Sequence, residues 1–246
     1  MTTESKSMLA KVLRAQAESY GCDVGDFTGD KNVIVEAPTD QPFLRMIGFG
    51  AGTVVSAHPS FVGWCRTALS EINGTHVFDA PTIVEIGSAL KEFGCTLGEI
   101  FDCFLPSAQV PKADKPEGFD VSFVEGDAVT ELYAHPGFEN SLTYHPDHTG
   151  IVVVASRDGI PCGISGANPM PPGLWAIGVD VLQTHRERGI ATYLVSELTQ
   201  ELLSRDLIPV YPTWYSNIHS RNTALRVGYR PAWVEITAIP VRKPKS

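Results

Sequence analysis

The sequence contains no long apolar run. The longest, from Ile151 to Ala155, is far shorter than the roughly 20 apolar residues that a membrane-spanning helix requires. Residues 1–7 are polar and do not resemble a secretion signal. We therefore expect a soluble, cytoplasmic protein that does not act at a membrane.

Basic residues are also few and scattered. The chain has 19 Lys and Arg against 28 Asp and Glu, which gives a formal net charge of −9. Its one basic group lies at the end of the chain, at Arg242, Lys243 and Lys245. Because nucleic acid is bound by concentrated basic faces, the composition argues against it as a partner. The acidic balance favours a cationic small substrate over an acidic one.

Cysteine and histidine patterns typical of disulfide or metal sites are missing. The five cysteines are odd in number and include no C-x-x-C pair, which predicts reduced thiols and no disulfide framework. His145 and His148 have the spacing of metal ligands, but they stand beside Pro146 and Asp147 without further ligands nearby. We interpret the pair as part of a solvated loop and expect no metal.

What is present indicates a folded chain with two domains. A hydrophobic content of 43% over 246 residues is enough for one large domain or two ordinary ones. Three prolines fall between Pro106 and Gly118, a composition typical of a linker or of a strap across the surface. We place the boundary there, with an N-terminal domain over residues 1–117 and a second domain over residues 118–246.

Hydrophobic periodicity in the N-terminal domain predicts a small α/β layer. Helices are expected over residues 8–20, 60–72 and 82–93, and strands over residues 32–36, 43–47 and 53–56. Gly48-Phe-Gly-Ala-Gly52 is similar to a dinucleotide-binding loop, but Thr53 holds its sixth position and a strand follows, so we favour a hairpin turn. An alternative for this domain is a degenerate copy of the second half that shapes an acceptor site or a dimer interface.

The second domain alternates strands and helices in a clearer order. Strands are predicted over residues 120–124, 150–156, 160–167, 174–181, 208–214 and 232–238, and long helices over residues 187–204 and 218–227. One or two short helices are expected between Asp127 and Thr143, and Asp158-Gly159 is a hairpin signal. Because Pro209 and Pro212 cannot donate to a ladder, strand 208–214 should be incompletely paired on one side.

One segment of this domain carries a chemical signal. The hexapeptide from Arg186 to Ala191 stands where a strand ends and a long helix starts. The first N–H groups of a helix lack internal acceptors and lie at the positive end of its dipole, which suits a pyrophosphate. Gly189 permits close approach of phosphates, and Arg186 and Arg188 can add charged hydrogen bonds. The alternative is an ordinary loop-to-helix junction with two surface arginines.

This hexapeptide resembles the Q/R-x-x-G-x-G/A signature of the GNAT superfamily of N-acyltransferases. Asn217-Ile-His-Ser220, followed by Ala224, Gly228 and Tyr229, is similar to the N-x-x-S/A…G-F/Y segment of that family. The resemblance covers roughly residues 119–238. It implies an α/β (α+β) fold with a mixed, mostly antiparallel sheet, splayed central strands and flanking helices, beside a smaller N-terminal α/β domain.

The resemblance also implies how acetyl-coenzyme A binds. Strands 174–181 and 208–214 would splay apart, and the pantetheine arm would pair with the backbone of the first of them. A backbone N–H would polarise the thioester carbonyl. The residues implied in binding are Val179, Val181, Arg186, Arg188, Gly189, Ile190, Ala191, Thr192, Asn217 and Ser220. Asn217 and Ser220 also fit a plain helix N-cap, and the two roles are compatible.

The catalytic residues depart from the family pattern. Many relatives place a tyrosine acid seven residues after Asn217, where this chain has Ala224, and some place a glutamate base where it has Trp175. Ser220, or a water held by Asn217, could protonate the thiolate instead. The remaining candidates for a base or a water relay are Asp180, Glu139 and His145. Amine deprotonation through ordered water would need none of them.

These features predict an acetyl-CoA-dependent N-acetyltransferase that acts on an amine by direct attack in a ternary complex. A competing hypothesis is a non-catalytic acyl-CoA-binding sensor or regulatory protein, suggested by the missing tyrosine and the additional domain. Acetyl-CoA and an amine acceptor are the expected partners, and a homodimer is one open assembly. For Trp214 and Tyr229 we favour core positions over a substrate pocket.

Overall fold

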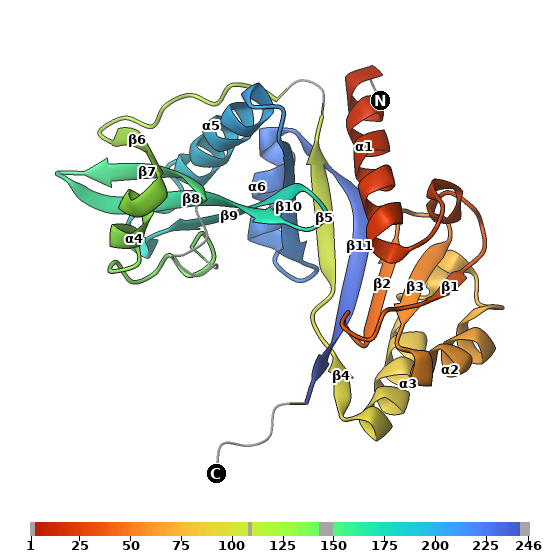
Figure 1. Ribbon diagram of the computed structural model, residues 1–246. Helices are drawn as coiled ribbons and strands as arrows, with labels where there is room; N and C mark the ends of the chain where they lie inside the picture. Colours follow the sequence, from red (N-terminus) through yellow and green to blue (C-terminus); the bar gives the residue numbers. More distant parts are fainter. Residues whose placement is uncertain (1–2, 108–109, 143–149, 242–246) are drawn as a thin grey trace, which may run out of the picture. The chain divides into compact units, whose positions relative to one another are not determined.

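The computed structural model describes residues 3–107, 110–142 and 150–241. Its contacts divide the chain into two compact units (Figure 1). One contains residues 1–9 and 104–231, and the other contains residues 10–103 and 232–246. Strands β5 (Phe101–Pro106) and β11 (Tyr229–Pro240) each continue along the chain from one unit into the other.

The division differs from the boundary expected at residue 117, because residues 104–117 group with the second half of the chain. Val110 and Ala113 pack against the core of that half. The Ser196 hydroxyl also donates a hydrogen bond of 3.0 Å to the Pro111 carbonyl. The proline-rich segment therefore acts as a strap held to its own unit. The last strand returns to the other unit, where residues 232–246 belong.

The unit formed around residues 104–231 is built on a mixed sheet with the strand order β6-β7-β8-β9-β10. Its strands are β6 (Asp120–Glu125), β7 (Ile151–Arg157), β8 (Ile160–Met170), β9 (Leu174–Val181) and β10 (Ile208–Trp214). Neighbours from β6 to β9 are antiparallel, and β9 and β10 are parallel. The predicted mixed, mostly antiparallel sheet is confirmed.

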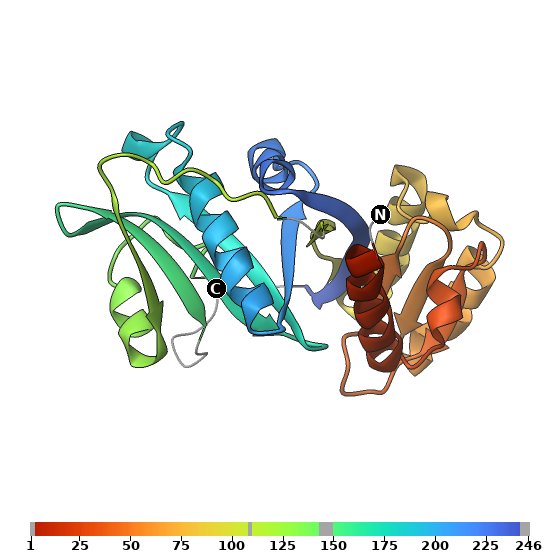
Figure 2. The same cartoon turned by 90° about the horizontal axis from the view of Figure 1, so that it is seen from above.

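Helices cover both faces of this sheet, as Figures 1 and 2 show. They are η4 (Gly126–Ala128), α4 (Val129–Leu132), η5 (Gln183–His185), α5 (Ile190–Ser204) and α6 (Ile218–Val227). Successive side chains of a strand point to opposite faces. Accordingly Val152 and Val154 of β7 pack with Leu132 of α4, whereas Val153 packs with α5.

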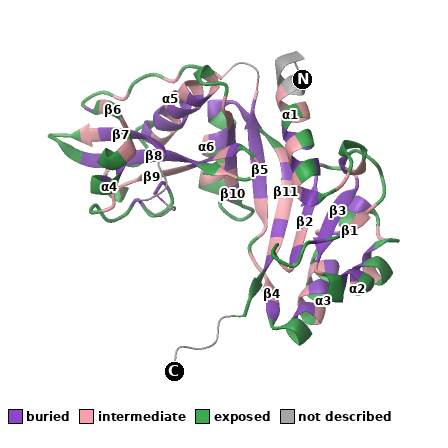
Figure 3. Cartoon of the chain, viewed as in Figure 1, coloured by how far each residue is buried: buried purple, intermediate pink, exposed green. Residues whose placement is uncertain are grey.

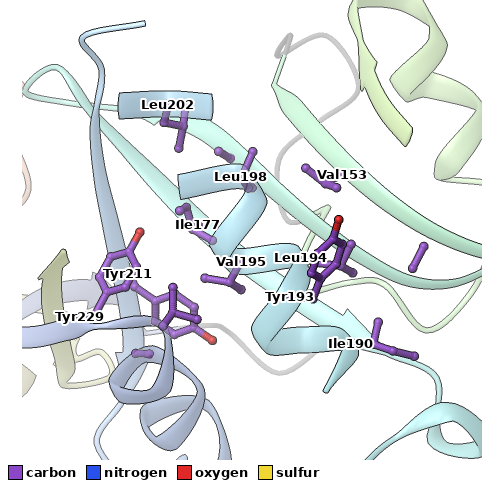
Figure 4. Packing of buried hydrophobic residues seen from close by; sticks show 14 of the residues in the cluster. Val153, Ile177, Ile190, Tyr193, Leu194, Val195, Leu198, Leu202, Tyr211 and Tyr229 are labelled. Carbon is purple, nitrogen blue, oxygen red and sulfur yellow. The ribbon is translucent and has the colours of Figure 1, made fainter. Parts of the chain in front are cut away.

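Helix α5 buries the core face that its sequence predicts. Ile190, Leu194, Leu198 and Leu202 are all buried against the strands, together with Tyr193 and Val195. Figure 4 shows these side chains facing Val153 and Ile177 of the sheet. Buried residues concentrate along β7, β8 and the inner face of α5 (Figure 3). This apolar contact fixes where the helix begins relative to the end of β9.

The strands of the other unit pair in the order β1-β3-β2-β11, and β4 pairs with β11. Its strands are β1 (Val33–Glu36), β2 (Leu44–Gly48), β3 (Thr53–Ala57) and β4 (Cys95–Leu97). Its helices are α1 (Thr3–Tyr20), η1 (Val24–Phe27), α2 (Pro59–Leu69), η2 (Gly74–His76), α3 (Ala80–Leu90) and η3 (Lys91–Phe93). Gly48 pairs with Thr53, so the predicted hairpin turn is confirmed. Among the described helices, none has the length and apolar character needed to cross a membrane.

A polar cluster in the unit of residues 10–103 and 232–246 centres on Glu235 of β11. Trp233 Nε1 donates a hydrogen bond of 2.8 Å to the Glu235 carboxylate. Nearby, Arg45 lies 4.3 Å from the centre of the Tyr20 ring and donates to the Ser19 carbonyl at 2.7 Å. Burial raises the pKa of Glu235, and the hydrogen bonds to Trp233 and Cys103 and the charge of Arg45 only partly oppose this effect.

Because the pKa of Glu235 is raised, we expect ionisation of this carboxyl group to lower the stability of the fold as pH rises. The folded state holds the Glu235 proton more tightly than the unfolded state, so stability is lost as pH increases through the folded pKa. We expect the melting temperature of Glu235→Gln, relative to the wild type, to increase between about pH 4 and about pH 8. A difference that stays constant over this range would contradict the prediction.

Candidate functional site

Strands β9 and β10 pair over only part of their length. Three residue pairs join them, and the last is Val210 with Ala176. Beyond this point β9 continues to Val181 and β10 continues to Trp214, with no further pair between these two fully described strands. The prediction of splayed central strands is confirmed, and we call the gap between them the fork.

The backbone of β9 presents alternate residues to the fork. Leu182 N–H donates a hydrogen bond of 2.9 Å to the Cys162 carbonyl at the start of β8. Because successive residues of a strand direct their N–H and C=O groups to opposite sides, Val181 and Val179 face away from β8. These are the two residues whose backbone the sequence assigns to a pantetheine arm. The Val181 carbonyl accepts a hydrogen bond of 3.1 Å from Arg186 Nε, which lies on the same side.

The loop between β9 and α5 has an unusual backbone. Glu187 has a φ of 65° and Gly189 a φ of 76°, both in the left-handed region. Helix α5 therefore begins at Ile190, later than the expected start at Glu187. Tyr193 N–H donates to the Gly189 carbonyl at 3.0 Å, which closes the first turn. The earlier N–H groups, including those of Ala191 and Thr192, have no acceptor within the helix.

The start of α5 offers room for an anion. A Cβ atom placed at Gly189 would meet no atom within 4 Å. Arg186, Arg188 and Gly189 are exposed, whereas Ile190 is buried and anchors the first turn in the core. Of the two arginines, Arg186 already donates to the Val181 carbonyl, while Arg188 extends from the exposed loop. The arrangement fits a phosphate at the positive end of the helix dipole.

The start of α6 lies beside the same strands. Asn217 is the N-cap residue, and its Oδ1 accepts a hydrogen bond of 3.1 Å from Ser220 N–H. The predicted capping role of Asn217 is confirmed. The Ser220 hydroxyl lies 3.0 Å from the hydroxyl of Tyr211 on β10. The sequence motifs point to Asn217 and Ser220 but give no reason to select Tyr211, which looks like an ordinary core aromatic.

A buried polar atom on β10 lacks a partner. Thr213 lies beyond the last pair of β10 with β9 and is 4% exposed. Its Oγ1 has no hydrogen-bond partner among the residues that the structure describes. Leaving a buried hydroxyl unsatisfied costs about 1–3 kcal/mol, so a bound molecule with polar groups would be favoured there. An amide-containing chain such as pantetheine fits this requirement.

Asp180, a candidate base from the sequence, has another task in the structure. Its carboxylate accepts hydrogen bonds of 2.7 Å from Asn140 N–H, from Asn140 Nδ2 and from Ser141 N–H. These bonds hold the loop that follows α4 onto β9. A proton on Asp180 would compete with them, so the geometry favours a structural role for this carboxylate over general base catalysis.

The same loop passes directly over glycines of the sheet. A Cβ atom placed at Gly178 would lie 2.0 Å from the Asn140 carbonyl oxygen, and one at Gly166 would lie 2.2 Å from the Ser141 carbonyl oxygen. Such approaches exclude any side chain. Asp180 and the two glycines together set the position of the loop against β8 and β9.

This contact predicts that Gly178→Ala destabilises the protein. The added methyl group must push the Asn140 backbone away, and overpacking of this kind costs about 1–3 kcal/mol. The measurement is the free energy of unfolding in urea. Gly63→Ala is the control, because a Cβ at Gly63 in α2 meets no atom within 4 Å, and its stability should be unchanged or slightly raised. Equal stability of the two variants would refute the assignment.

The other catalytic candidates do not converge on the fork. Glu139 is exposed, and hydrogen bonds from the backbone N–H groups of Gly137 and Glu139 lower its pKa, which makes it a weaker base. Trp214 was expected in the core but is 44% exposed, whereas Tyr229 is fully buried as predicted. The core expectation for Trp214 was wrong: this residue ends β10, beyond the last pair with β9, and its side chain is exposed. His145 and His148 lie outside the described residues.

The described part of the chain contains no cluster of three or more His, Cys, Asp or Glu side chains suited to a metal ion. The five cysteines are free thiols, and burial raises the pKa of Cys65 to about 12. A thiol with a pKa as high as that of Cys65 is a poor nucleophile at neutral pH.

Comparisons with known proteins agree with this geometry. Residues 119–229 match the model of the acetyltransferase (GNAT) family. None of the curated protein sequences matches the chain. A GCN5-related N-acetyltransferase-like protein from Streptococcus suis shares 15% identity, with a TM-score of 0.55 over 94% of this chain and 98% of that one. A GCN5-related N-acetyltransferase from Kribbella flavida shares 16% identity, with a TM-score of 0.50 over 97% and 96%.

A third similar structure is an acetyltransferase of the GNAT family from Colwellia psychrerythraea, with 12% identity and a TM-score of 0.45. The match covers 61% of this chain and 60% of that one. At these identities, the similarity to the Streptococcus suis and Kribbella flavida structures bears on the fold and not on the substrate.

Proposed function

Because residues 119–229 match the model of the acetyltransferase (GNAT) family, we propose that the protein transfers an acetyl group from acetyl-CoA to an amine. The reaction proceeds by direct attack in a ternary complex. The observation that carries this proposal is the fork, where pairing of β9 and β10 ends beside the start of α5. The fork supplies open backbone groups, and the helix start supplies N–H groups for phosphates.

Each part of the site has a role in binding. The N–H groups of Gly189, Ile190, Ala191 and Thr192 bind the diphosphate, and Arg188 adds charge-assisted hydrogen bonds. The backbones of Val179 and Val181 pair with the pantetheine amides, and Thr213 Oγ1 gains a partner. This placement brings the thioester to the narrow end of the fork, near Ser220 and Asn217.

The chemical step then requires little from the protein. A backbone N–H of β9 polarises the thioester carbonyl, and ordered water takes the proton of the amine. The Ser220 hydroxyl, or a water held by Asn217, donates a hydrogen bond to the sulfur as the carbon–sulfur bond breaks. The acidic balance of the chain, with a net charge of −9, supports a cationic acceptor. Free cysteines support a cytoplasmic location.

The substitution Gly189→Trp tests the helix start directly. An indole at this position fills the open space before α5 where the phosphates would lie, so coenzyme A affinity should fall by about tenfold or more. The measurement is isothermal titration with coenzyme A. Gly173→Trp is a matched control, because Gly173 has a φ of 78°, also meets no atom within 4 Å, and precedes the opposite end of β9. Equal affinities of the two variants would rule out this loop.

Turnover separates an enzyme from a sensor. Thiol release from acetyl-CoA is measured with a panel of amines that includes a polyamine, free lysine, an aromatic amine and a peptide with a free amino terminus. We expect release with at least one of them. Coenzyme A binding without release from any amine would instead favour a non-catalytic acyl-CoA-binding protein.

A further inference from the structure

Two hydroxyl groups meet where the fork opens. Val210 is the last residue of β10 that pairs with β9, so Tyr211 is the first residue beyond the pairing. Its hydroxyl lies 3.0 Å from Ser220 Oγ in the first turn of α6. Ser220 is fixed in turn by the hydrogen bond from its N–H to Asn217 Oδ1. The two hydroxyls are therefore held beside the first turn of α6, next to the point on β10 where pairing with β9 has ended.

Burial decides which hydroxyl donates. Tyr211 is 1% exposed, and buried hydroxyl hydrogens are almost always given to an acceptor. Ser220 Oγ is the partner that the structure provides for this phenol. If Tyr211 instead accepted a hydrogen bond from Ser220, the phenol hydrogen would need a second acceptor in the core. The favoured arrangement thus has Tyr211 donating to Ser220, which leaves the Ser220 hydrogen free to point elsewhere.

The surroundings of the phenol keep it protonated. Burial raises the pKa of Tyr211 to about 12, the hydrogen bond with Ser220 lowers it in part, and the negative charge of Asp180 raises it further. The phenol is therefore a donor throughout the neutral range. Ser220 is only half-buried, so its own hydrogen is not confined to the core.

We infer that Tyr211 is a positioning residue for acetyl transfer, which orients the Ser220 hydroxyl toward the thioester sulfur. The inference rests on the proposed function. In the reaction the amine nitrogen bonds to the carbonyl carbon, the carbon–sulfur bond breaks with its electron pair on sulfur, and one amine proton passes to water. The oriented Ser220 hydrogen stabilises the charge on sulfur. Tyr211 on β10 thus acts on the sulfur indirectly, through Ser220. In this chain α6 carries Ala224 at the position where relatives often have a tyrosine.

The thiol of bound coenzyme A reports this hydrogen bond without an amine and without turnover. The ultraviolet absorbance of the thiolate is titrated with pH in the complex of the full chain with coenzyme A. A hydrogen bond to the thiolate lowers the thiol pKa, so Tyr211→Phe and Ser220→Ala should each raise it by about one unit relative to the wild type. The double variant should titrate like Ser220→Ala, because Tyr211 acts only through Ser220.

The control is Tyr229→Phe. This residue is also a buried tyrosine of the same core, and its hydroxyl lies 2.8 Å from Thr199 Oγ1, so its loss should leave the thiol pKa unchanged. A Tyr211→Phe complex that titrates like the wild type overturns the inference and leaves the proposed function standing. Failure of the wild type to bind coenzyme A overturns both.

Discussion

The site depends on the early end of the pairing between β9 and β10. One edge of β9 is satisfied along its whole length, because it pairs with β8 from Leu174 to Val181. The other edge is satisfied only as far as Ala176. Pro212 lies on β10 beyond the last pair and has no N–H to donate to any neighbouring strand. Unpaired N–H and C=O groups along a strand normally invite pairing with another chain. Here they form the place where an extended amide chain can bind.

The open edge is useful only if the helix start lies beside it. The buried face of α5 provides this constraint, since Ile190 and Leu194 lock the first turns against the sheet. The helix packs closely on the sheet, because a Cβ atom at Gly163 of β8 would lie only 2.8 Å from the Ile190 side chain. A rigid scaffold thus positions the loop from Arg186 to Gly189, as is common for loops that bind ligands.

Much of this could be predicted from the sequence. The strands and helices of the second half, the hairpin at Asp158-Gly159 and the capping by Asn217 follow from local patterns that tertiary contacts did not override. Tertiary contacts decided the rest. The sequence does not predict β4, which has only three residues, or β5, which ends in a proline. Helix α5 begins later than predicted because Glu187 adopts a left-handed conformation, which is unusual for a glutamate.

The site residues divide in the same way. Motif spacing could find Gly189, Asn217 and Ser220, because each occupies a position set by local backbone geometry. The three hydrogen bonds to Asp180 join residues that are 39 or 40 positions apart, so no local pattern predicts them. Tyr211 and Ser220 are nine positions apart but lie on different elements, β10 and α6, and no sequence motif links them. The decisive measurement is a crystal structure of the complex with coenzyme A. We expect the diphosphate on the N–H groups of residues 189–192 and the pantetheine between β9 and β10. A diphosphate bound elsewhere, or β9 and β10 paired along their full length in that complex, would contradict it.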